Sequence, residues 1–223
     1  MFTRRRSKIF HREAIPWPAT SVYNVLSRSA IFQRLYELAA EDILAHQRQG
    51  SLLDIGTGPG RLLIKLHRAA PELRLEGIDI SPSMVTKARS NIALAGVASD
   101  IEITESTVTR LPFPDGSFDM VVSMLSVHHW KDPVAGLNEV HRVLKDGGLS
   151  LHYDVARDTP RPVLREAALR LGRFGAMLLW LVAFEEPFYS GEEFLSLAEA
   201  SLFTKGQGRF VGGLYCLSLN KSA

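Results

Sequence analysis

The sequence predicts an α/β domain in which a mostly parallel β-sheet carries helices on both faces and is closed by an antiparallel hairpin. Between residues 51 and 155, short apolar runs alternate with segments of helical periodicity, as in strand–helix–strand units. The run from Phe118 to Leu125 is almost continuously apolar, which is typical of a strand buried on both faces. The runs 203–210 and 213–219 are separated only by a glycine-containing turn, and this spacing predicts the hairpin.

Helical periodicity and end signals define the expected helices. Residues 28–48 carry apolar side chains at helical spacing, and Gly50 follows the pattern. A further helix is expected at about residues 60–70. Ser81 and Pro82 supply the N-cap and the first position of the next helix. The last helix of this part is predicted over 133–144 with Gly147-Gly148 as its end, and the strands are expected at 52–55, 73–80, 101–105, 118–125 and 149–155.

The composition is that of one globular domain. The chain has 223 residues, of which 46% are hydrophobic and 22% are charged, and this is enough to bury a full core. The one cysteine, Cys216, excludes a disulfide framework and a cysteine-built zinc site, and it is expected to pack in the core. No metal site is predicted.

The net charge of +2 arises from an uneven distribution. Residues 1–12 contain five Lys or Arg and no acid, whereas the rest of the chain has 21 bases against 24 acids. We therefore expect residues 1–16 to form a basic mobile tail on a mildly acidic body. The body lacks the positive charge of a nucleic-acid-binding domain, although the tail alone could bind RNA weakly.

No segment of the sequence is expected to cross a membrane. Pro16-Trp17-Pro18 interrupts the chain where a signal peptide would have its apolar region. The apolar run 174–184 is shorter than a bilayer-spanning helix. A cytoplasmic location is the resulting expectation.

The strongest functional signal is a glycine-rich turn after the first strand. Gly56, Gly58 and Gly60 lie between a predicted strand and a predicted helix, where glycines let the backbone approach a ligand. Asp79 ends the next strand, and its carboxylate can accept both hydroxyl hydrogens of a ribose. Arg61 occupies the position at which a dinucleotide fingerprint requires Gly or Ala, and Asp54 suits a cationic amino group better than a pyrophosphate. These features favour S-adenosylmethionine over a nicotinamide cofactor.

Four ordered segments carry a resemblance to a known family. They are residues 53–60 (LDIGTGPG), 77–81 (GIDIS), 111–119 (LPFPDGSFD) and 142–148 (RVLKDGG). Together they resemble class I S-adenosylmethionine-dependent methyltransferases, in particular the group of the ubiquinone/menaquinone enzymes and small-molecule O-methyltransferases. The resemblance covers roughly residues 50–155. It implies a Rossmann-like seven-stranded sheet with an antiparallel last strand, and S-adenosylmethionine as the cofactor.

The resemblance also implies roles for individual residues. The methionine end of the cofactor would meet Asp54 and the first glycines, and the ribose would meet Asp79. In place of the acid that the family usually has before the LPFP segment, this chain has Ser106-Thr107-Val108, and Thr107 can still accept one hydrogen bond from the adenine amine. The expected cofactor-binding residues are Asp54, Gly56, Gly58, Gly60, Asp79, Ile80, Met84, Thr107, Val108 and Ser123.

A histidine and an aspartate are the candidate catalytic pair. His128 follows the fourth strand, and Asp154 ends the fifth, which this fold places beside it. A histidine oriented by a carboxylate is suited to deprotonating a hydroxyl near neutral pH. His129 is the alternative base. The competing interpretation is that the two histidines only mark a loop-to-helix boundary and that Asp154 caps the segment after it.

The resemblance divides the chain into a tail and one methyltransferase domain. The apolar stretch around 174–184 would help to cover a hydrophobic acceptor such as a quinone or a lipid-like phenol. A dimer face, a membrane-surface helix and a core helix are alternatives for this stretch. The expected parts are a tail (1–16) and a domain (17–223) with a helical cap (17–50), a cofactor-binding core (51–155), lid helices (156–200) and a terminal hairpin (201–223).

The predicted function is methylation of a small hydrophobic acceptor, with O-methylation favoured over N- or C-methylation. Two alternatives are a non-catalytic S-adenosylmethionine-binding protein and an RNA or protein methyltransferase that uses the basic tail. Ser123-Met124-Leu125-Ser126 is unlike the Asn/Asp-Pro-Pro-Tyr/Phe segment of nucleic-acid amino methyltransferases. The sequence does not define the oligomeric state.

Overall fold

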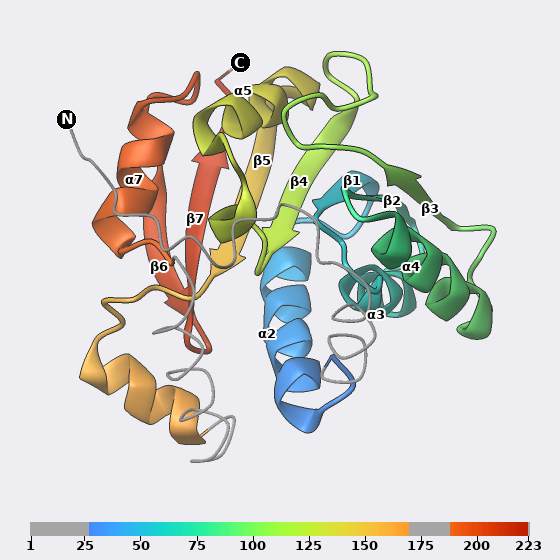
Figure 1. Ribbon diagram of the computed structural model, residues 1–223, viewed down its shortest axis with the longest axis horizontal. Helices are drawn as coiled ribbons and strands as arrows, with labels where there is room; N and C mark the ends of the chain where they lie inside the picture. Colours follow the sequence, from blue (N-terminus) through green and yellow to red (C-terminus); the bar gives the residue numbers. More distant parts are fainter. Residues whose placement is uncertain (1–26, 170–187, 223) are drawn as a thin grey trace.

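A computed structural model describes residues 27–169 and 188–222 of the chain, and these residues form a layered α/β domain (Figure 1). Seven strands make one sheet in the order β3-β2-β1-β4-β5-β7-β6. Strands β3, β2, β1, β4 and β5 are parallel to one another, and β7 is antiparallel to both β5 and β6. The predicted sheet and its terminal hairpin are confirmed. The strands are β1 (Gly50–Ile55), β2 (Leu73–Asp79), β3 (Ile101–Glu105), β4 (Phe118–Met124), β5 (Leu144–Asp154), β6 (Gln207–Val211) and β7 (Leu214–Asn220).

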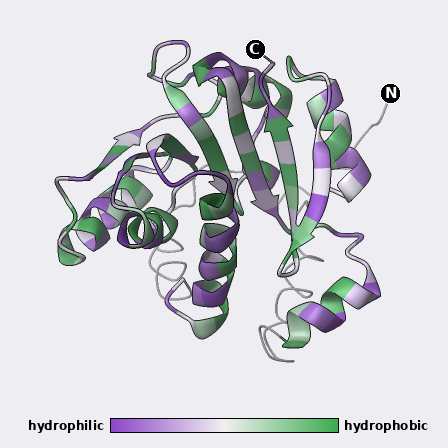
Figure 2. Ribbon diagram, turned by 180° about the vertical axis from the view of Figure 1, so that it is seen from behind, coloured by the Kyte–Doolittle hydropathy of each residue, from purple (hydrophilic) through white to green (hydrophobic). Residues whose placement is uncertain are grey.

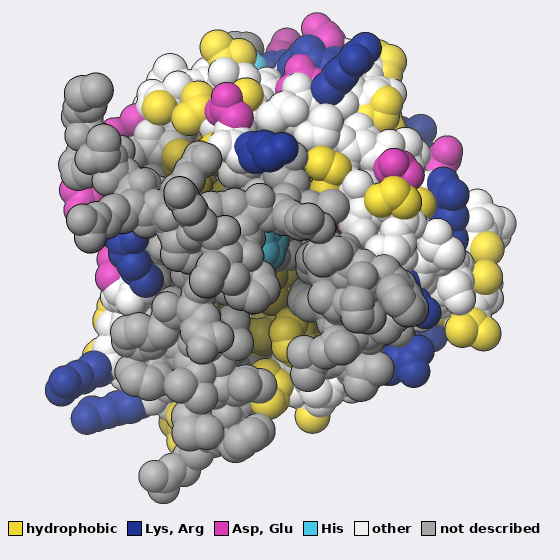
Figure 3. All heavy atoms as spheres, in the orientation of Figure 1, with side chains coloured by type: hydrophobic (Ala, Val, Ile, Leu, Met, Phe, Trp, Pro, Cys, Tyr) yellow, Lys and Arg dark blue, Asp and Glu magenta, His cyan; other side chains and the backbone are white. Residues whose placement is uncertain are grey.

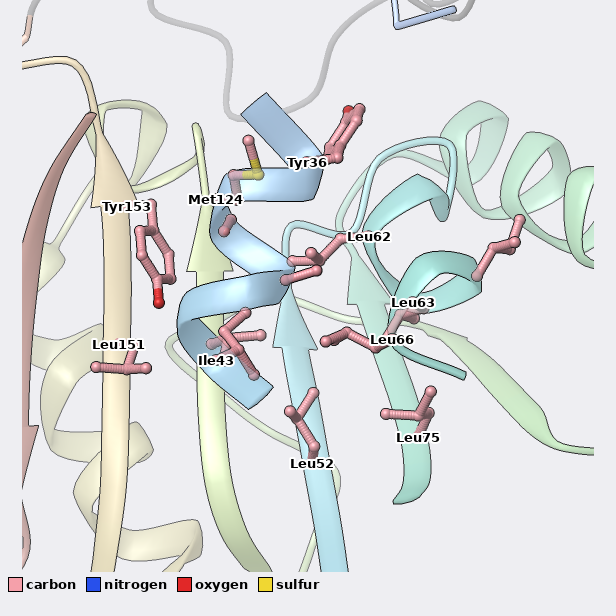
Figure 4. Close-up of a cluster of buried hydrophobic side chains, with 14 of the residues drawn as sticks. Tyr36, Ile43, Leu52, Leu62, Leu63, Leu66, Leu75, Met124, Leu151 and Tyr153 are labelled. Carbon is pink, nitrogen blue, oxygen red and sulfur yellow. The ribbon is translucent and has the colours of Figure 1, made fainter. Parts of the chain in front are cut away.

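Helices cover both faces of the sheet because each presents one apolar side. Helices α2 (Ala30–His46), α3 (Arg61–Ala69) and α4 (Pro82–Leu94) supply side chains to one core, shared with β1, β2 and β5 (Figure 4). Helices α5 (Pro133–Val143) and α7 (Gly191–Glu199) supply the other core, next to β7. Hydrophobic and hydrophilic residues alternate along the helices, as expected of helices with one buried side (Figure 2).

Hydrogen bonds join α2 to the far half of the sheet. The hydroxyl of Tyr153 on β5 donates to Asp42 Oδ2 at 2.6 Å, and Arg209 on β6 donates to the same oxygen at 2.6 Å. The N-terminal helix is therefore fixed against the strand that ends in Asp154.

One strand boundary differs from the sequence prediction. Gly147-Gly148 were expected to end the helix before β5, but α5 ends at Val143 and β5 begins at once at Leu144. The register moves from Phe118↔Leu144 to Met120↔Leu149, so the glycines belong to an irregular stretch within the strand. Gly147 has φ +76° and its N–H donates to the carbonyl of Lys221. The glycine pair therefore forms part of a bulge in β5 and does not end a helix.

Several predicted features lie outside the described residues, namely the basic tail 1–16, the segment 17–26 and the apolar run 174–184. Of the predicted lid region, residues 161–169 are helical, and α7 packs beside α5. Among the described segments, no helix is long and apolar enough to cross a membrane.

Candidate functional site

A cleft opens at the carboxyl ends of the central parallel strands, where ligands of doubly wound α/β folds bind. It encloses about 710 Å³ including the open space at its mouth. Seven residues predicted to bind the cofactor line it: Gly56, Gly58, Asp79, Ile80, Met84, Thr107 and Val108. The remaining lining residues are Ile55, Ile78, Ser106, Leu125, Ser126, His129 and Trp130.

The glycine turn follows β1 in a conformation that requires glycine. Gly56, Gly58 and Gly60 have φ values of +72°, +52° and +74°. A Cβ on Gly56 would also lie 2.1 Å from the Oγ of Ser126 across the cleft. Gly60 lies at the N-cap of α3 and does not line the cleft. The turn thus places backbone, and not side chains, on the floor of the cleft.

Asp79 links the glycine turn to the start of α4. Its two carboxylate oxygens accept the N–H groups of Gly58 and Ser81, each at 2.9 Å. Burial raises the pKa of this carboxyl, and the two backbone hydrogen bonds oppose that shift. Because carboxylate oxygens have two lone pairs each, Asp79 keeps acceptor capacity for ribose hydroxyls. Ser81 occupies the predicted N-cap position, although its Oγ pairs with the Oγ of Ser83 and does not cap the helix.

Asp54 is a buried acid with an unsatisfied oxygen. Its side chain is 2% exposed, and its Oδ1 has no hydrogen-bond partner among the described residues. Burial raises its pKa to about 7; the Thr57 hydroxyl opposes this shift, and the charge of the nearby Asp79 adds to it. A cationic amino group would satisfy this oxygen and favour the ionised carboxylate. Asp54 does not itself line the cleft, and the contact predicted between it and the methionine end of S-adenosylmethionine stays a prediction.

Ser123 lies behind the cleft wall. It is fully buried on β4 beside His152 of β5, it does not line the cleft, and its Oγ has no partner within the described part of the chain. His152 is also fully buried, and burial lowers its pKa to about 4. The cofactor contact predicted for Ser123 stays a prediction.

His128 and Asp154 are in direct contact, as the strand order led us to expect. His128 Nδ1 lies 2.9 and 2.8 Å from the two carboxylate oxygens of Asp154. The same carboxylate accepts the backbone N–H of His128 at 3.2 Å and that of Val155 at 2.9 Å. Because an ionised carboxylate only accepts hydrogen bonds, Nδ1 carries the hydrogen and Nε2 is the basic nitrogen. His128 is thus fixed in one tautomer.

The two histidines have different positions after β4. His129 lines the cleft, whereas His128 is 8% exposed and does not. The ring of His128 lies between those of His129 and Phe188, with centroid distances of 3.9 and 4.4 Å. In the space-filling view, a histidine side chain is visible near hydrophobic side chains (Figure 3).

The residues on either side of the two histidines include cleft-lining residues that the site prediction missed. Leu125 lines the cleft with φ +54°, which is unusual for a non-glycine residue, and its N–H donates to the carbonyl of Tyr153 at 2.8 Å. Trp130 Nε1 donates to Ser126 Oγ at 3.1 Å, so these two residues form one wall of the cleft. The sequence signal that could have identified these cleft residues was their position directly after an apolar strand.

Comparisons with known proteins agree with this geometry. A family described as a methyltransferase domain matches residues 53–151. The chain is 36% identical over 110 residues to a demethylmenaquinone methyltransferase of Deinococcus radiodurans, covering 49% of this chain and 44% of that protein. It is 30% identical over 142 residues to the ubiquinone/menaquinone biosynthesis C-methyltransferase UbiE of Geobacter sulfurreducens, covering 62% and 55%. The chain thus spans about half the length of the curated relatives that it matches.

Solved structures support the fold. A putative S-adenosylmethionine-dependent methyltransferase from Methanococcus maripaludis superposes with a TM-score of 0.75 and 21% identity, covering 100% of this chain and 98% of that one. Another structure in this fold, named PigF, was solved with the cofactor product S-adenosylhomocysteine (TM-score 0.66, 17% identity, covering 91% of this chain and 58% of that one). The matched segment, the seven-stranded sheet and the cleft agree with one another: residues 53–151 match a methyltransferase domain, the chain has the fold of class I S-adenosylmethionine-dependent methyltransferases, and S-adenosylmethionine is the cofactor that this fold and cleft fit.

Proposed function

We propose that this protein methylates a hydroxyl of a small hydrophobic acceptor, with His128 as the general base and Asp154 as its orienting partner. The observation that carries the proposal is the contact of His128 Nδ1 with both oxygens of Asp154 at the end of the two strands beside the cleft. An imidazole with its second nitrogen held by a carboxylate is a common arrangement for a general base.

The cofactor supplies an activated methyl group on a sulfonium sulfur. The residues of this chain hold it: Asp54 pairs with its amino group, Asp79 accepts the ribose hydroxyls, and Met84 and Val108 border the adenine. The pairing with Asp54 is supported by the unsatisfied Oδ1 of that residue. The turn glycines Gly56 and Gly58 let the backbone approach the methionine portion.

The base completes the proton balance of the transfer. The methyl–sulfur bond would break as a methyl–oxygen bond forms, and the hydroxyl proton would pass to Nε2 of His128. Asp154 keeps its charge throughout and stabilises the resulting imidazolium, because three N–H groups already donate to it. His129, which lines the cleft, is the alternative base.

The acceptor is inferred from the apolar side chains near the dyad. Leu125 and Trp130 line the cleft, and the ring of Phe188 contacts that of His128 at a centroid distance of 4.4 Å, tilted by 49°. Flat, apolar rings such as quinols fit this surface best. The names of the relatives, which refer to demethylmenaquinone, ubiquinone and menaquinone, support the same acceptor class.

C-methylation of a hydroquinone is the second candidate. It is favoured by the printed name of one relative group, whose members are C-methyltransferases of ubiquinone and menaquinone biosynthesis. The same base would serve it, because deprotonating a ring hydroxyl makes the adjacent ring carbon nucleophilic. The ring carbon would then form the new bond to the methyl group as the methyl–sulfur bond breaks. Its hydrogen would leave as a proton to solvent while the ring oxygen regains a proton from the base, so that one proton is lost in total.

The test is methyl transfer by the full chain from S-adenosylmethionine to a panel of phenols and quinols. We expect a monomethylated product, and NMR of that product separates O- from C-methylation. His128→Ala should abolish most turnover, whereas His129→Ala is the matched variant at the neighbouring position. Loss of turnover only in His129→Ala would transfer the role of base to that residue. Tight cofactor binding without any transfer would favour a non-catalytic binding protein.

A further inference from the structure

We propose that one side of α5, formed by Gly136, Glu139 and Arg142, positions the turn 106–111 against the adenine of the cofactor. Glu139 and Arg142 are thus positioning residues for cofactor affinity, although neither lines the cleft. The inference rests on the proposed placement of the adenine at Thr107 and Val108.

The spacing of the three α5 residues puts them on one side of the helix. Gly136, Glu139 and Arg142 are each three residues apart, so they form a row along α5. The helix is fixed at its start by Asp132, whose side chain accepts the N–H of Ala135 at 2.9 Å. Side chains in a rigid row of this kind can hold a neighbouring loop in one position.

Glu139 and Arg142 bind the end of the turn through its backbone. Glu139 Oε2 accepts the N–H of Leu111 at 2.9 Å, and Arg142 Nη2 donates to the carbonyl of the same residue at 3.0 Å. Arg142 Nη1 donates to the carbonyl of Phe113 and to Asp115 Oδ1, both at 2.8 Å. Two of the sequence segments that carried the family resemblance are therefore joined by one guanidinium group.

The start of the turn is bound to the ribose-binding strand. The N–H of Ser106 donates to the carbonyl of Asp79 at 3.1 Å. Within the turn, the N–H of Arg110 donates to the carbonyl of Thr107 at 3.2 Å, and Ser106 Oγ donates to the carbonyl of Arg110 at 3.0 Å. Thr107 and Val108 are consequently held between β2 on one side and α5 on the other.

Gly136 gives the same helix direct contact with the cleft wall. A Cβ on this residue would lie 2.8 Å from the ring of Trp130 and 3.1 Å from a methyl group of Val108. Both Trp130 and Val108 line the cleft. The absence of a side chain at Gly136 therefore sets how closely the wall and the turn approach α5.

The charges on Glu139 and Arg142 persist over the physiological pH range. Arg142 Nε lies 2.8 Å from Glu139 Oε1, and this hydrogen bond is the main reason why the pKa of Glu139 is lowered and that of Arg142 is raised. The Arg142 side chain is 29% exposed, so the ion pair itself adds little to folding stability. Glu139 and Arg142 together make three hydrogen bonds to backbone groups of Leu111 and Phe113. The main effect of the pair is therefore on the position of the turn.

The experiment compares two ligands that differ only in the adenine. The full chain and its variants are titrated by calorimetry with S-adenosylhomocysteine and with S-ribosylhomocysteine, which keeps the ribose and the amino acid. We expect Arg142→Met to weaken S-adenosylhomocysteine binding about tenfold and S-ribosylhomocysteine binding by less than about twofold. Glu139→Gln, which preserves size, should give the same selective loss and keeps the test valid if Arg142→Met folds poorly.

Arg34→Met is the matched control, because it removes an Arg–Glu pair of the same helical spacing, Arg34–Glu37 on α2. It should leave both affinities unchanged. Equal losses for the two ligands in the α5 variants, or no loss, would overturn the inference while leaving the cofactor assignment intact. A wild-type chain that bound neither ligand would overturn the cofactor placement and this inference together.

Discussion

Two buried aspartates, one in each half of the sheet, are partnered in opposite ways. Asp54 on β1 has an oxygen without a partner in the described structure, and its pKa is raised to about 7. Asp154 at the end of β5 accepts hydrogen bonds from the ring and backbone of His128 and from the N–H of Val155. In the proposed function, a cationic ligand would therefore complete the Asp54 half, whereas Asp154 and the proposed base are already partnered within the protein.

This contrast separates the two tasks of a methyltransferase. An unpaired buried carboxylate is costly to the folded chain, and a ligand that pairs with it gains affinity. A base, in contrast, must already be oriented when the acceptor arrives, and hydrogen bonds from the protein provide that orientation. The five predictions below test this division, beginning with the largest expected effect.

Removal of the base should affect the rate and not cofactor binding. We expect His128→Ala to lower the methyl-transfer rate by about 10²–10⁴-fold, the usual contribution of a general base. Its affinity for S-adenosylhomocysteine should stay within about twofold of wild type, because the dyad lies in the other half of the site. Single-turnover kinetics and calorimetry measure the two quantities. A comparable loss in both would show that the two halves are not separate.

Removal of the charge on Asp54, in contrast, should weaken cofactor binding. We expect Asp54→Asn to weaken S-adenosylmethionine binding about 10- to 100-fold, because the ligand's ammonium loses its charged partner. The ligand-free variant should unfold at a higher temperature than wild type, since it no longer buries an ionisable group with an unsatisfied oxygen. Asp154→Asn is the comparison, and it should unfold at a lower temperature because it disturbs a satisfied network.

The raised pKa of Asp54 predicts how affinity depends on pH. Below about pH 7 the folded, ligand-free protein holds this carboxyl protonated, so binding a cation requires release of the proton. Affinity should rise up to about tenfold per pH unit below 7 and level off above it. The pH dependence should disappear in Asp54→Asn. A wild-type affinity that did not change with pH would contradict the protonated state of Asp54 below about pH 7.

The raised pKa of Asp54 also predicts how folding stability depends on pH, with a dependence opposite to that of the affinity. Because its pKa is raised on folding, the folded chain binds more protons than the unfolded chain between the unfolded pKa and about pH 7. This contribution to the stability of the ligand-free protein is therefore lost as the pH rises through that interval. Denaturant melts of wild type and Asp54→Asn at several pH values measure the difference.

The smallest expected effect concerns the adenine turn. Thr107 lines the cleft, and its Oγ1 lies 3.2 Å from Thr109 Oγ1. Thr107→Asp would supply a charged acceptor for the adenine amine, and we expect about a three- to tenfold gain in S-adenosylhomocysteine affinity. Thr109→Asp, two residues further on, should leave the affinity unchanged. A gain in both variants would point to a general charge effect.

Local patterns predicted the parts of the fold that depend on neighbours in the sequence. The glycine turn and the acid at the end of β2 could be placed because a strand, a tight turn and a helix follow one another directly. The His128–Asp154 contact also followed from sequence, since parallel strands β4 and β5 bring their carboxyl ends together. Gly147-Gly148 misled the prediction because a glycine pair is equally compatible with a helix end and with a bulge.

Other features depend on contacts between distant residues. Arg142 reaches Leu111 and Phe113 across 31 and 29 positions, which no local pattern encodes. The different positions of His128 and His129 depend on the short 3₁₀ turn Val127–His129, in which adjacent residues point in different directions. These features required the structure.

The most direct test of the central claim is a calorimetric titration of the full chain at pH 8 with S-adenosylmethionine and, separately, with NAD. The unsatisfied carboxylate of Asp54 and the ribose acceptor Asp79 predict saturable binding of S-adenosylmethionine, a clear loss of that binding in Asp54→Asn, and no binding of NAD. Binding of NAD without binding of S-adenosylmethionine would contradict the account.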